Sequence, residues 1–119
     1  MENDLAFAIR DSHPVSPLHS LIIPKRHIAD YFELTEEEVV SCAQLLAAAK
    51  QDIKHIDETV TGFNVGINVG KDAGQSVMHC HIHLISRRRG DVENPQGGVR
   101  HLMPGKGHYK RSQRSQRRP

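Results

Sequence analysis

The chain has 119 residues, a length that suits one domain with a single hydrophobic core, and its 16 basic and 14 acidic residues give a formal net charge of +2. No apolar run approaches the roughly 18 residues of a membrane span, and no basic start precedes an apolar stretch, so we expect neither a membrane helix nor a signal peptide. Two cysteines, Cys42 and Cys80, are too few for a disulfide framework and indicate a reducing compartment, with the cytoplasm as the expected location.

Positive charge is concentrated at the C-terminal end. Residues 106–119 carry six basic and no acidic side chains, which leaves ten basic and fourteen acidic residues, a net charge of −4, in residues 1–105. Because the tail has no aliphatic side chain to bury, we expect a folded domain in residues 1–105 and a basic, disordered tail in residues 106–119. Basic tails can touch nucleic acid, but a solvated end is the favoured interpretation, so we do not expect nucleic acid as a partner.

The first two predicted elements are short strands separated by a loop. The apolar run in residues 5–9 is typical of a buried strand, and two prolines exclude regular structure from residues 11–17. A second apolar run covers residues 19–26, where Pro24 ends the strand or confines it to a sheet edge.

The principal helix is predicted from residue 35 onward. Thr35, with Glu38 three residues later, forms a capping box, which is a common start of a helix. Apolar residues then recur at alternating steps of three and four, which predicts one apolar stripe: Val39, Cys42, Leu46, Ala49, Ile53 and Ile56. The stripe can pack on a sheet or form a dimer contact, and both interpretations stay open.

Two more strands and a turn complete the predicted domain. Apolar residues alternate in residues 59–70 and again in residues 75–85, which predicts two strands, and the glycine-bounded residues 70–74 predict a turn between them. Strands joined by turns, with one long helix, indicate an α+β fold in which an antiparallel sheet packs on one principal helix.

The fourth predicted strand carries three histidines, His79, His81 and His83, at every second position. Side chains two residues apart share a strand face, so we expect the three imidazoles together on one face. A polar face, a metal site and a nucleophilic site all fit such a row. The outer two positions lie about 13 Å apart on a regular strand, so one ion could bind two imidazoles more readily than three. An imidazole nucleophile needs an orienting neighbour, which favours the central His81.

The motif around this row resembles a known family signature. Residues 75–85 read Gln-Ser-Val-Met-His-Cys-His-Ile-His-Leu-Ile, which is similar to the signature of the histidine triad (HIT) family of nucleotide hydrolases and transferases. The resemblance runs from Asn3 to Tyr109, and the residues after the row are most similar to hydrolases of dinucleoside polyphosphates. It implies a HIT-like fold, in which the sheets of two protomers can join into one.

The resemblance also implies catalytic roles. In the family the middle histidine, here His81, attacks an α-phosphate, and the flanking His79 and His83 assist it. His19 matches the upstream histidine that the family places behind the triad in a hydrogen-bond relay. One departure concerns the turn before His19, because the family's usual Pro-Gly-His is Pro-Leu-His at residues 17–19.

Four further residues match substrate-binding positions of the family. Asp11 stands where the family binds the ribose hydroxyls, and a carboxylate can accept from two vicinal hydroxyls. A turn-forming aspartate is an equally good interpretation of Asp11. Asn68 matches an amide near the sugar-phosphate, and Gln75 and Ser76 match donors to oxygens of the scissile phosphate.

The resemblance therefore implies an enzyme that cleaves dinucleoside polyphosphates or related AMP conjugates at the α-phosphate through a nucleotidyl-histidine intermediate. The alternatives are a purine nucleoside phosphoramidase, a nucleotide-binding protein with little turnover, and a metal-binding regulatory protein. No metal or other cofactor is required, although Mg²⁺ can accompany a polyphosphate substrate. The basic residues 87–89 suit a long anionic substrate or a solvated loop. The expected partners are the nucleotide and a second copy of the chain, without a membrane.

Overall fold

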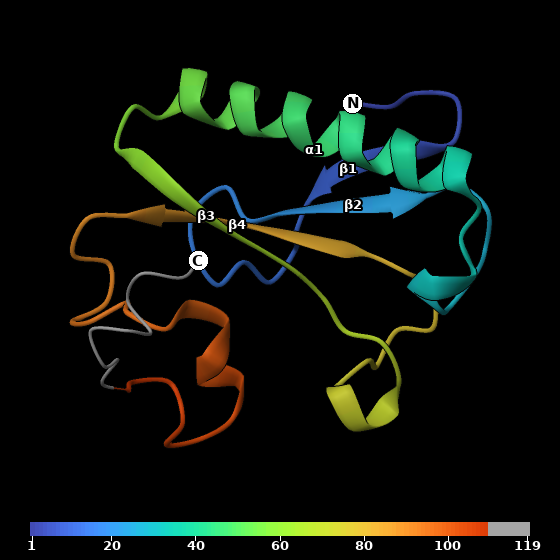
Figure 1. Ribbon diagram of the computed structural model, residues 1–119. Coiled ribbons are helices and arrows are strands. Elements are labelled where there is room, and N and C mark those ends of the chain that lie inside the picture. Colours follow the sequence, from blue (N-terminus) through green and yellow to red (C-terminus); the bar gives the residue numbers. More distant parts are fainter. Residues whose placement is uncertain (110–119) are drawn as a thin grey trace, which may run out of the picture.

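One antiparallel sheet and one long helix organise residues 1–109, which are the residues that this computed structural model describes (Figure 1). The strands lie in the order β1-β2-β4-β3, and every neighbouring pair is antiparallel. Their bounds are Ala6–Arg10 for β1, Ser20–Pro24 for β2, Val60–Ile67 for β3 and Ile82–Arg88 for β4. The helix α1 (Glu36–Ile56) packs on one face. The predicted α+β fold, with an antiparallel sheet and one principal helix, is confirmed.

The sheet has one covered and one open face. Ile82 and Leu84 of β4 are buried in the core cluster with α1, whereas His83 between them is only half-buried. Strand pairing places Leu21 of β2 and Gly66 of β3 on either side of His83. Paired residues of antiparallel strands point to the same side, so these three positions share the face away from α1, which we call the open face.

Helix α1 begins with the predicted capping box and has a further anchor in Arg26. The Thr35 hydroxyl accepts from the Glu38 amide at 3.1 Å, and the Glu38 carboxylate accepts from the Thr35 amide at 2.9 Å. Arg26 donates to both carboxylate oxygens of Glu38, at 2.7 and 3.0 Å. The two capping-box bonds satisfy amides that a helix start otherwise leaves unpaired, and Arg26 holds the Glu38 carboxylate in place.

The buried stripe of α1 lacks three of the predicted residues, and one of them, Val39, is only half-buried. Its apolar members are Cys42, Leu45, Ala49 and Ile53. Leu45 is buried where the sequence favoured Leu46, which packs only partly on the core. Ile56 is 57% exposed; it is the last helical residue, and the chain turns there from α1 toward β3 (Figure 1).

Strand β4 is shorter than predicted. It begins at Ile82, so His79 and His81 precede it without regular secondary structure. The Cys80 amide donates to the Ile28 carbonyl at 2.7 Å, outside the strand pairing of the sheet, which explains the late start. Burial nevertheless alternates as predicted, since Cys80 and Ile82 are buried and the histidines between and around them are half-buried.

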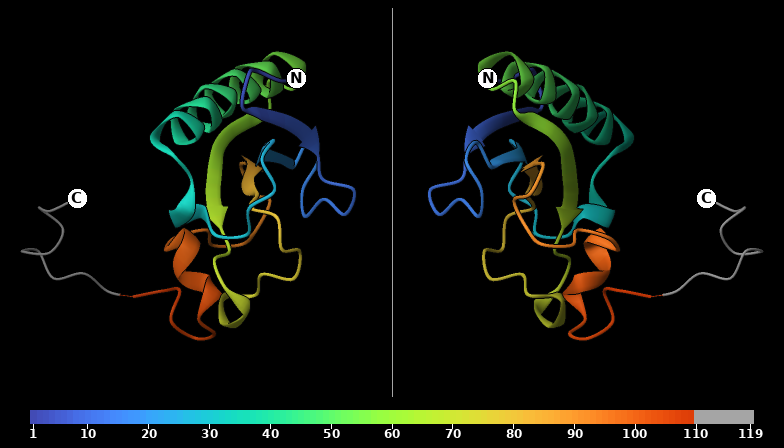
Figure 2. Two further views of the ribbon diagram at one scale, coloured as in Figure 1. Left: turned by 90° about the vertical axis from the view of Figure 1, so that its right-hand side faces the viewer. Right: turned by 90° about the vertical axis from the view of Figure 1, so that its left-hand side faces the viewer.

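Short segments cover part of the open face. The 3₁₀ helices η2 (Lys71–Ala73) and η3 (Gly98–Leu102) lie away from α1, on the other side of the sheet (Figure 2). A third one, η1 (Tyr31–Glu33), precedes α1. Within residues 1–109, no helix combines the length and apolar character needed to cross a membrane. The predicted tail extends beyond residue 109 and there lies outside the described residues.

Candidate active site

Two backbone carbonyl groups fix the rings of His79 and His81. Nδ1 of His81 lies 2.8 Å from the carbonyl oxygen of His79, and Nε2 of His79 lies 2.7 Å from that of Pro24. A carbonyl oxygen can only accept, so both of these ring nitrogens carry hydrogen. In neutral His81 the lone pair therefore resides on Nε2, and this nitrogen is the available nucleophile.

A second chain of hydrogen bonds runs from the backbone to the open face. The Val15 amide donates to Nδ1 of His19 at 3.1 Å, and Nε2 of His19 lies 2.9 Å from Nδ1 of His83. An amide can only donate, so neutral His19 carries its hydrogen on Nε2 and donates it to His83. His83 in turn carries its hydrogen on Nε2. The structure thus brings His19 and His83 together in the arrangement that the predicted relay requires.

His83 stands between His81 and His19, with ring centroids 5.1 Å from each. Burial lowers the pKa of His83 from its ordinary value, and the neighbouring His81 and His19 lower it further. At neutral pH His83 therefore stays uncharged, and its Nε2–H is an oriented neutral donor.

Asp11 uses its two oxygens differently. Oδ1 accepts from the His13 amide at 2.8 Å, and Oδ2 lies 3.5 Å from Nε2 of His19. The His13 amide lowers the pKa of Asp11, and the nearby histidines lower it further, so Asp11 is a carboxylate at neutral pH. One oxygen makes the predicted turn while the other faces the relay, and both interpretations of Asp11 stay open.

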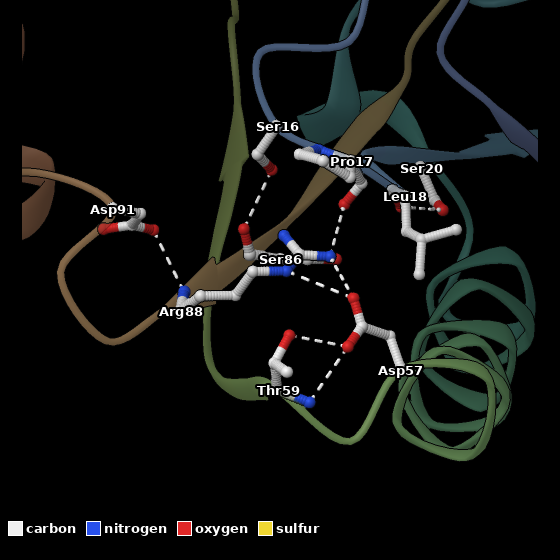
Figure 3. A network of polar contacts seen from close by, with 9 residues as sticks. All are labelled: Ser16, Pro17, Leu18, Ser20, Asp57, Thr59, Ser86, Arg88 and Asp91. Atoms are coloured by element: carbon white, nitrogen blue, oxygen red, sulfur yellow. Dashed lines mark hydrogen bonds and ion pairs between the residues drawn. The ribbon is translucent and has the colours of Figure 1, made fainter.

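The loop that leads to His19 has an unusual backbone. Among residues 1–109, Leu18 is the only non-glycine residue with a positive φ, at 72°. Leu18 stands where the HIT signature has a glycine, which adopts such angles without strain. Three side chains fix the loop by donating to main-chain oxygens (Figure 3): Arg88 to Pro17 at 3.1 Å, Ser20 to Leu18 at 2.8 Å, and Ser16 to Ser86 at 2.8 Å.

The three remaining predicted residues occupy different surroundings. Gln75 is buried, and its carboxamide accepts from the Gly70 amide and donates to the Ala29 carbonyl, both at 2.9 Å. It thereby closes the turn before the histidine row, and contact with a phosphate would require these bonds to exchange. Ser76 is exposed beside it, and Asn68 lines a cavity on the open face.

Asp11, His19 and His83 are also the one group of three potential metal ligands within residues 1–109, with donor atoms within 4.8 Å of one another. A ligating imidazole needs its lone pair on the nitrogen that binds the ion. The Val15 amide places the lone pair of His19 on Nδ1, so Nε2 could bind an ion only as an imidazolate. The geometry therefore favours a proton relay at these residues.

The sequence motif does not reveal three groups that contact the histidines of this site. The Val15 amide and the Pro24 carbonyl belong to the backbone, and every residue type offers a carbonyl. Nδ1 of His27 lies 3.4 Å from Nδ1 of His79. The motif spacing fixes which histidines meet, but not what holds their rings.

An antiparallel sheet with a row of fixed imidazoles leading into its fourth strand, and a relay histidine behind them, defines the histidine triad class of protein. The HIT domain model matches residues 1–90, about three quarters of the chain. The chain belongs to the HIT family.

Individual relatives agree with this assignment. An uncharacterized HIT-like protein of Synechococcus elongatus is 40% identical over 87 residues, which cover 73% of this chain and 75% of the relative. Bis(5'-adenosyl)-triphosphatase of Dictyostelium discoideum is 38% identical over 93 residues, 76% of this chain and 60% of that enzyme. The crystal structure of Plasmodium falciparum diadenosine triphosphate hydrolase, bound to cyclomarin A, superposes with a TM-score of 0.72 at 28% identity, over 79% of this chain and 63% of that one.

Proposed function

We propose that this protein is a nucleotide hydrolase or transferase that cleaves dinucleoside polyphosphates or related AMP conjugates at the α-phosphate. The observation that carries the proposal is the fixed tautomer of His81, because its Nδ1–H donates to the His79 carbonyl and leaves Nε2 as a nucleophile. The Dictyostelium and Plasmodium relatives, which are named for the hydrolysis of diadenosine triphosphate, support this substrate class.

The proposed reaction proceeds in two displacements. Nε2 of His81 attacks the α-phosphorus in line, a phosphorus–nitrogen bond forms, and the bond from phosphorus to the leaving group breaks. Water then attacks the phosphorus of the nucleotidyl-histidine and loses a proton, the phosphorus–nitrogen bond breaks, and AMP leaves with Nε2 of His81 restored. The Nε2–H of His83 donates to a phosphoryl oxygen on which charge develops, which lowers the barrier.

The leaving group needs a proton when its bond to phosphorus breaks. His79 and His83 are the two candidates within the row. His79 is the better one, provided that it is protonated on both nitrogens: its Nε2–H is held by the Pro24 carbonyl, so the transferred proton would come from Nδ1. The lowered pKa of His83 keeps that ring neutral, and its one Nε2–H is donated to the phosphoryl group. His19 acts behind His83 and holds its ring and tautomer.

The substrate contacts follow the family positions. Asp11 would accept from the ribose hydroxyls, Asn68 would lie near the sugar-phosphate, and Gln75 and Ser76 would serve the oxygens of the scissile phosphate. No step needs a metal, and Mg²⁺ would enter only with a polyphosphate substrate.

The arginines after the histidine row favour the AMP conjugates, including phosphoramidates, within this substrate range. Arg87 is paired with Asp91 at 2.7 Å and Arg88 with Asp57 at 2.9 Å, so neither guanidinium group is free to neutralise a long polyphosphate. A purine nucleoside phosphoramidase is therefore the second candidate function.

We also propose a homodimer in the cytoplasm. Strand β3 is an edge of the sheet, and its outer backbone groups can pair with the same strand of a second copy. Cys42 and Cys80 are free and buried, which suits a reducing compartment. Sedimentation velocity at several concentrations tests the dimer.

Replacement of the nucleophile tests the chemistry. His81→Ala should abolish hydrolysis of diadenosine triphosphate and of adenosine phosphoramidate while the protein still folds and binds AMP. Wild-type protein denatured at alkaline pH, where the phosphorus–nitrogen bond of a nucleotidyl-histidine survives, should carry covalently bound AMP, and the variant should carry none, as measured by mass spectrometry. His55→Ala, at an exposed helix position, is the matched control and should remain active. Activity of His81→Ala within about tenfold of wild type, or an AMP adduct on it, would remove His81 as the nucleophile.

A further inference from the structure

A fifth imidazole, that of His27, lies beside the first histidine of the row. Its Nδ1 is 3.4 Å from Nδ1 of His79, and the two rings meet edge to face with their centroids 4.9 Å apart. His27 is exposed, whereas His79 is half-buried. The pair therefore connects solvent with the histidine row, and the reaction described so far makes no use of His27.

Hydrogen bonds next to both rings hold the segment after β2 against the segment before β4. The Cys80 amide donates to the Ile28 carbonyl at 2.7 Å, and these two residues directly follow the two histidines. The buried Gln75 carboxamide donates to the carbonyl of Ala29, the next residue along, at 2.9 Å. The meeting of the two imidazoles is thus built into the fold, because main-chain groups beside each ring fix their distance.

The nitrogen of His79 that faces His27 is the one from which a transferred proton would come. Nε2 of His79 donates to the Pro24 carbonyl at 2.7 Å, so the lone pair of neutral His79 resides on Nδ1. The hydrogen of the contact between the two Nδ1 atoms then belongs to His27. In this tautomer Nε2 of His27 has a lone pair, and an exposed ring can take up a proton there from water.

We propose that His27 supplies the proton that His79 gives to the leaving group, an inference that rests on the proposed function. Nε2 of His27 binds a proton from water, and the hydrogen on Nδ1 of His27 moves to Nδ1 of His79. His79 passes this hydrogen to the leaving-group atom as the bond to phosphorus breaks, and His27 is left neutral. The exposed His27 ring can turn toward solvent and leave Nδ1 of His79 to the leaving group. In the second displacement the same path returns the proton lost by the attacking water.

The two cations that precede His27 are each held by a carboxylate. Nζ of Lys25 lies 2.6 Å from Glu2, and Arg26 donates to both carboxylate oxygens of Glu38. A guanidinium group does not release its proton at neutral pH, whereas an imidazole gains and loses one there. Among the basic side chains of residues 25–27, His27 is therefore the one that both contacts the row and suits proton transfer.

Two leaving groups of different basicity test the inference. The 4-nitrophenyl ester of AMP loses its leaving group as an anion, whereas an alkylamine phosphoramidate of AMP must protonate the departing amine. His27→Asn keeps an N–H donor near the position of Nδ1 but cannot pass on a proton. It should lower kcat/KM for the phosphoramidate by about tenfold or more. The value for the nitrophenyl ester should change by less than about threefold, which also shows that the variant is folded. His55→Asn, at an exposed position of α1, should change neither value.

A double variant tests whether His27 acts through His79. In a His79→Ala background, His27→Asn should cause no further loss of kcat/KM for the phosphoramidate. Three outcomes would overturn the inference: wild-type activity of His27→Asn on the phosphoramidate, equal losses for both substrates, and a full additional loss in the double variant. Failure of the proposed function is seen separately, when wild-type protein cleaves neither substrate.

Discussion

At Leu18 the backbone conformation destabilises the folded state, whereas the packing of the side chain stabilises it. A positive φ costs a non-glycine residue about 1–2 kcal/mol, since Cβ crowds the backbone. The half-buried side chain of Leu18 packs on the core cluster, and that burial offsets the cost. The loop before His19 therefore stores strain that the packing and the contacts from Ser20 and Arg88 hold in place.

Leu18→Gly should accordingly change the free energy of unfolding by less than about 1 kcal/mol, because relief of strain and loss of packing nearly cancel. Leu18→Val should destabilise by about 2 kcal/mol, since a β-branched residue tolerates positive φ least. Urea denaturation followed by circular dichroism measures both. A loss of about 3 kcal/mol in Leu18→Gly, typical of a core leucine deletion, would show that the strain is negligible.

The sequence predicts the reactive residues of the site better than the groups that hold their rings in place. The period-two spacing of His79, His81 and His83 predicts that their side chains gather, and burial alternates accordingly. The groups that fix the imidazoles are the amide of Val15 and the carbonyl of Pro24. Backbone groups are nearly independent of residue type, so only the folded chain shows which of them face a ring.

At the scale of single elements, the start of α1 is the part of the fold that the sequence predicts best. Its capping box can be predicted from Thr35 and Glu38 alone. Arg26 adds a contact to Glu38 that the local sequence does not predict. The ends of strands are harder to predict, because pairing with other parts of the chain decides where a strand begins and ends. β4 starts late since Cys80 pairs with Ile28, and β3 ends at Ile67, before the predicted residue 70.

Glu38 makes the stability of α1 depend on pH. Hydrogen bonds from Arg26 and from the Thr35 amide lower the pKa of Glu38 to about 2. A carboxylate with a depressed pKa in the folded state stabilises the protein above its unfolded value and loses this contribution as pH falls. Wild-type stability should therefore decline from about pH 4.5 toward pH 2.

Glu38→Gln should lower the free energy of unfolding at pH 7 by about 2 kcal/mol and flatten that decline, because the charged acceptor is gone. Urea denaturation at a series of pH values measures both effects. Glu37→Gln, on the exposed side of the same helical turn, should change stability by under about 1 kcal/mol. Parallel acid curves for wild type and Glu38→Gln would exclude Glu38 as the source.

At the scale of the whole molecule, Arg88 joins three parts of the chain. It extends from the end of β4, pairs with Asp57 at the C-terminal cap of α1, and donates to Pro17 in the loop before His19 (Figure 3). Thr59 and Arg88 together lower the pKa of Asp57 to about 2, so the pair stays charged. The helix end thereby helps to position a loop of the site.

Arg88→Gln should cost about 1 kcal/mol in stability and reduce kcat several-fold with little change in KM, since the relay loses its support but substrate contacts remain. A double-mutant cycle with Asp57→Asn should give a coupling free energy of about 0.5–1 kcal/mol. Arg89→Gln, at an exposed neighbour, is the control and should leave both quantities unchanged. Equal losses of kcat in both arginine variants would indicate a general charge effect.

The hydrogen bond from the Val15 amide determines which substitutions position 15 tolerates. The tautomers of His19 and His83 depend on a donor that nineteen of the twenty amino acids supply, so the side chain at position 15 is free to vary without altering the protonation pattern. Proline alone removes the donor. The tautomers of His19 and His83 therefore do not depend on the side chain at position 15, which borders the cavity. Substitutions there can alter ligand preference while both tautomers stay the same.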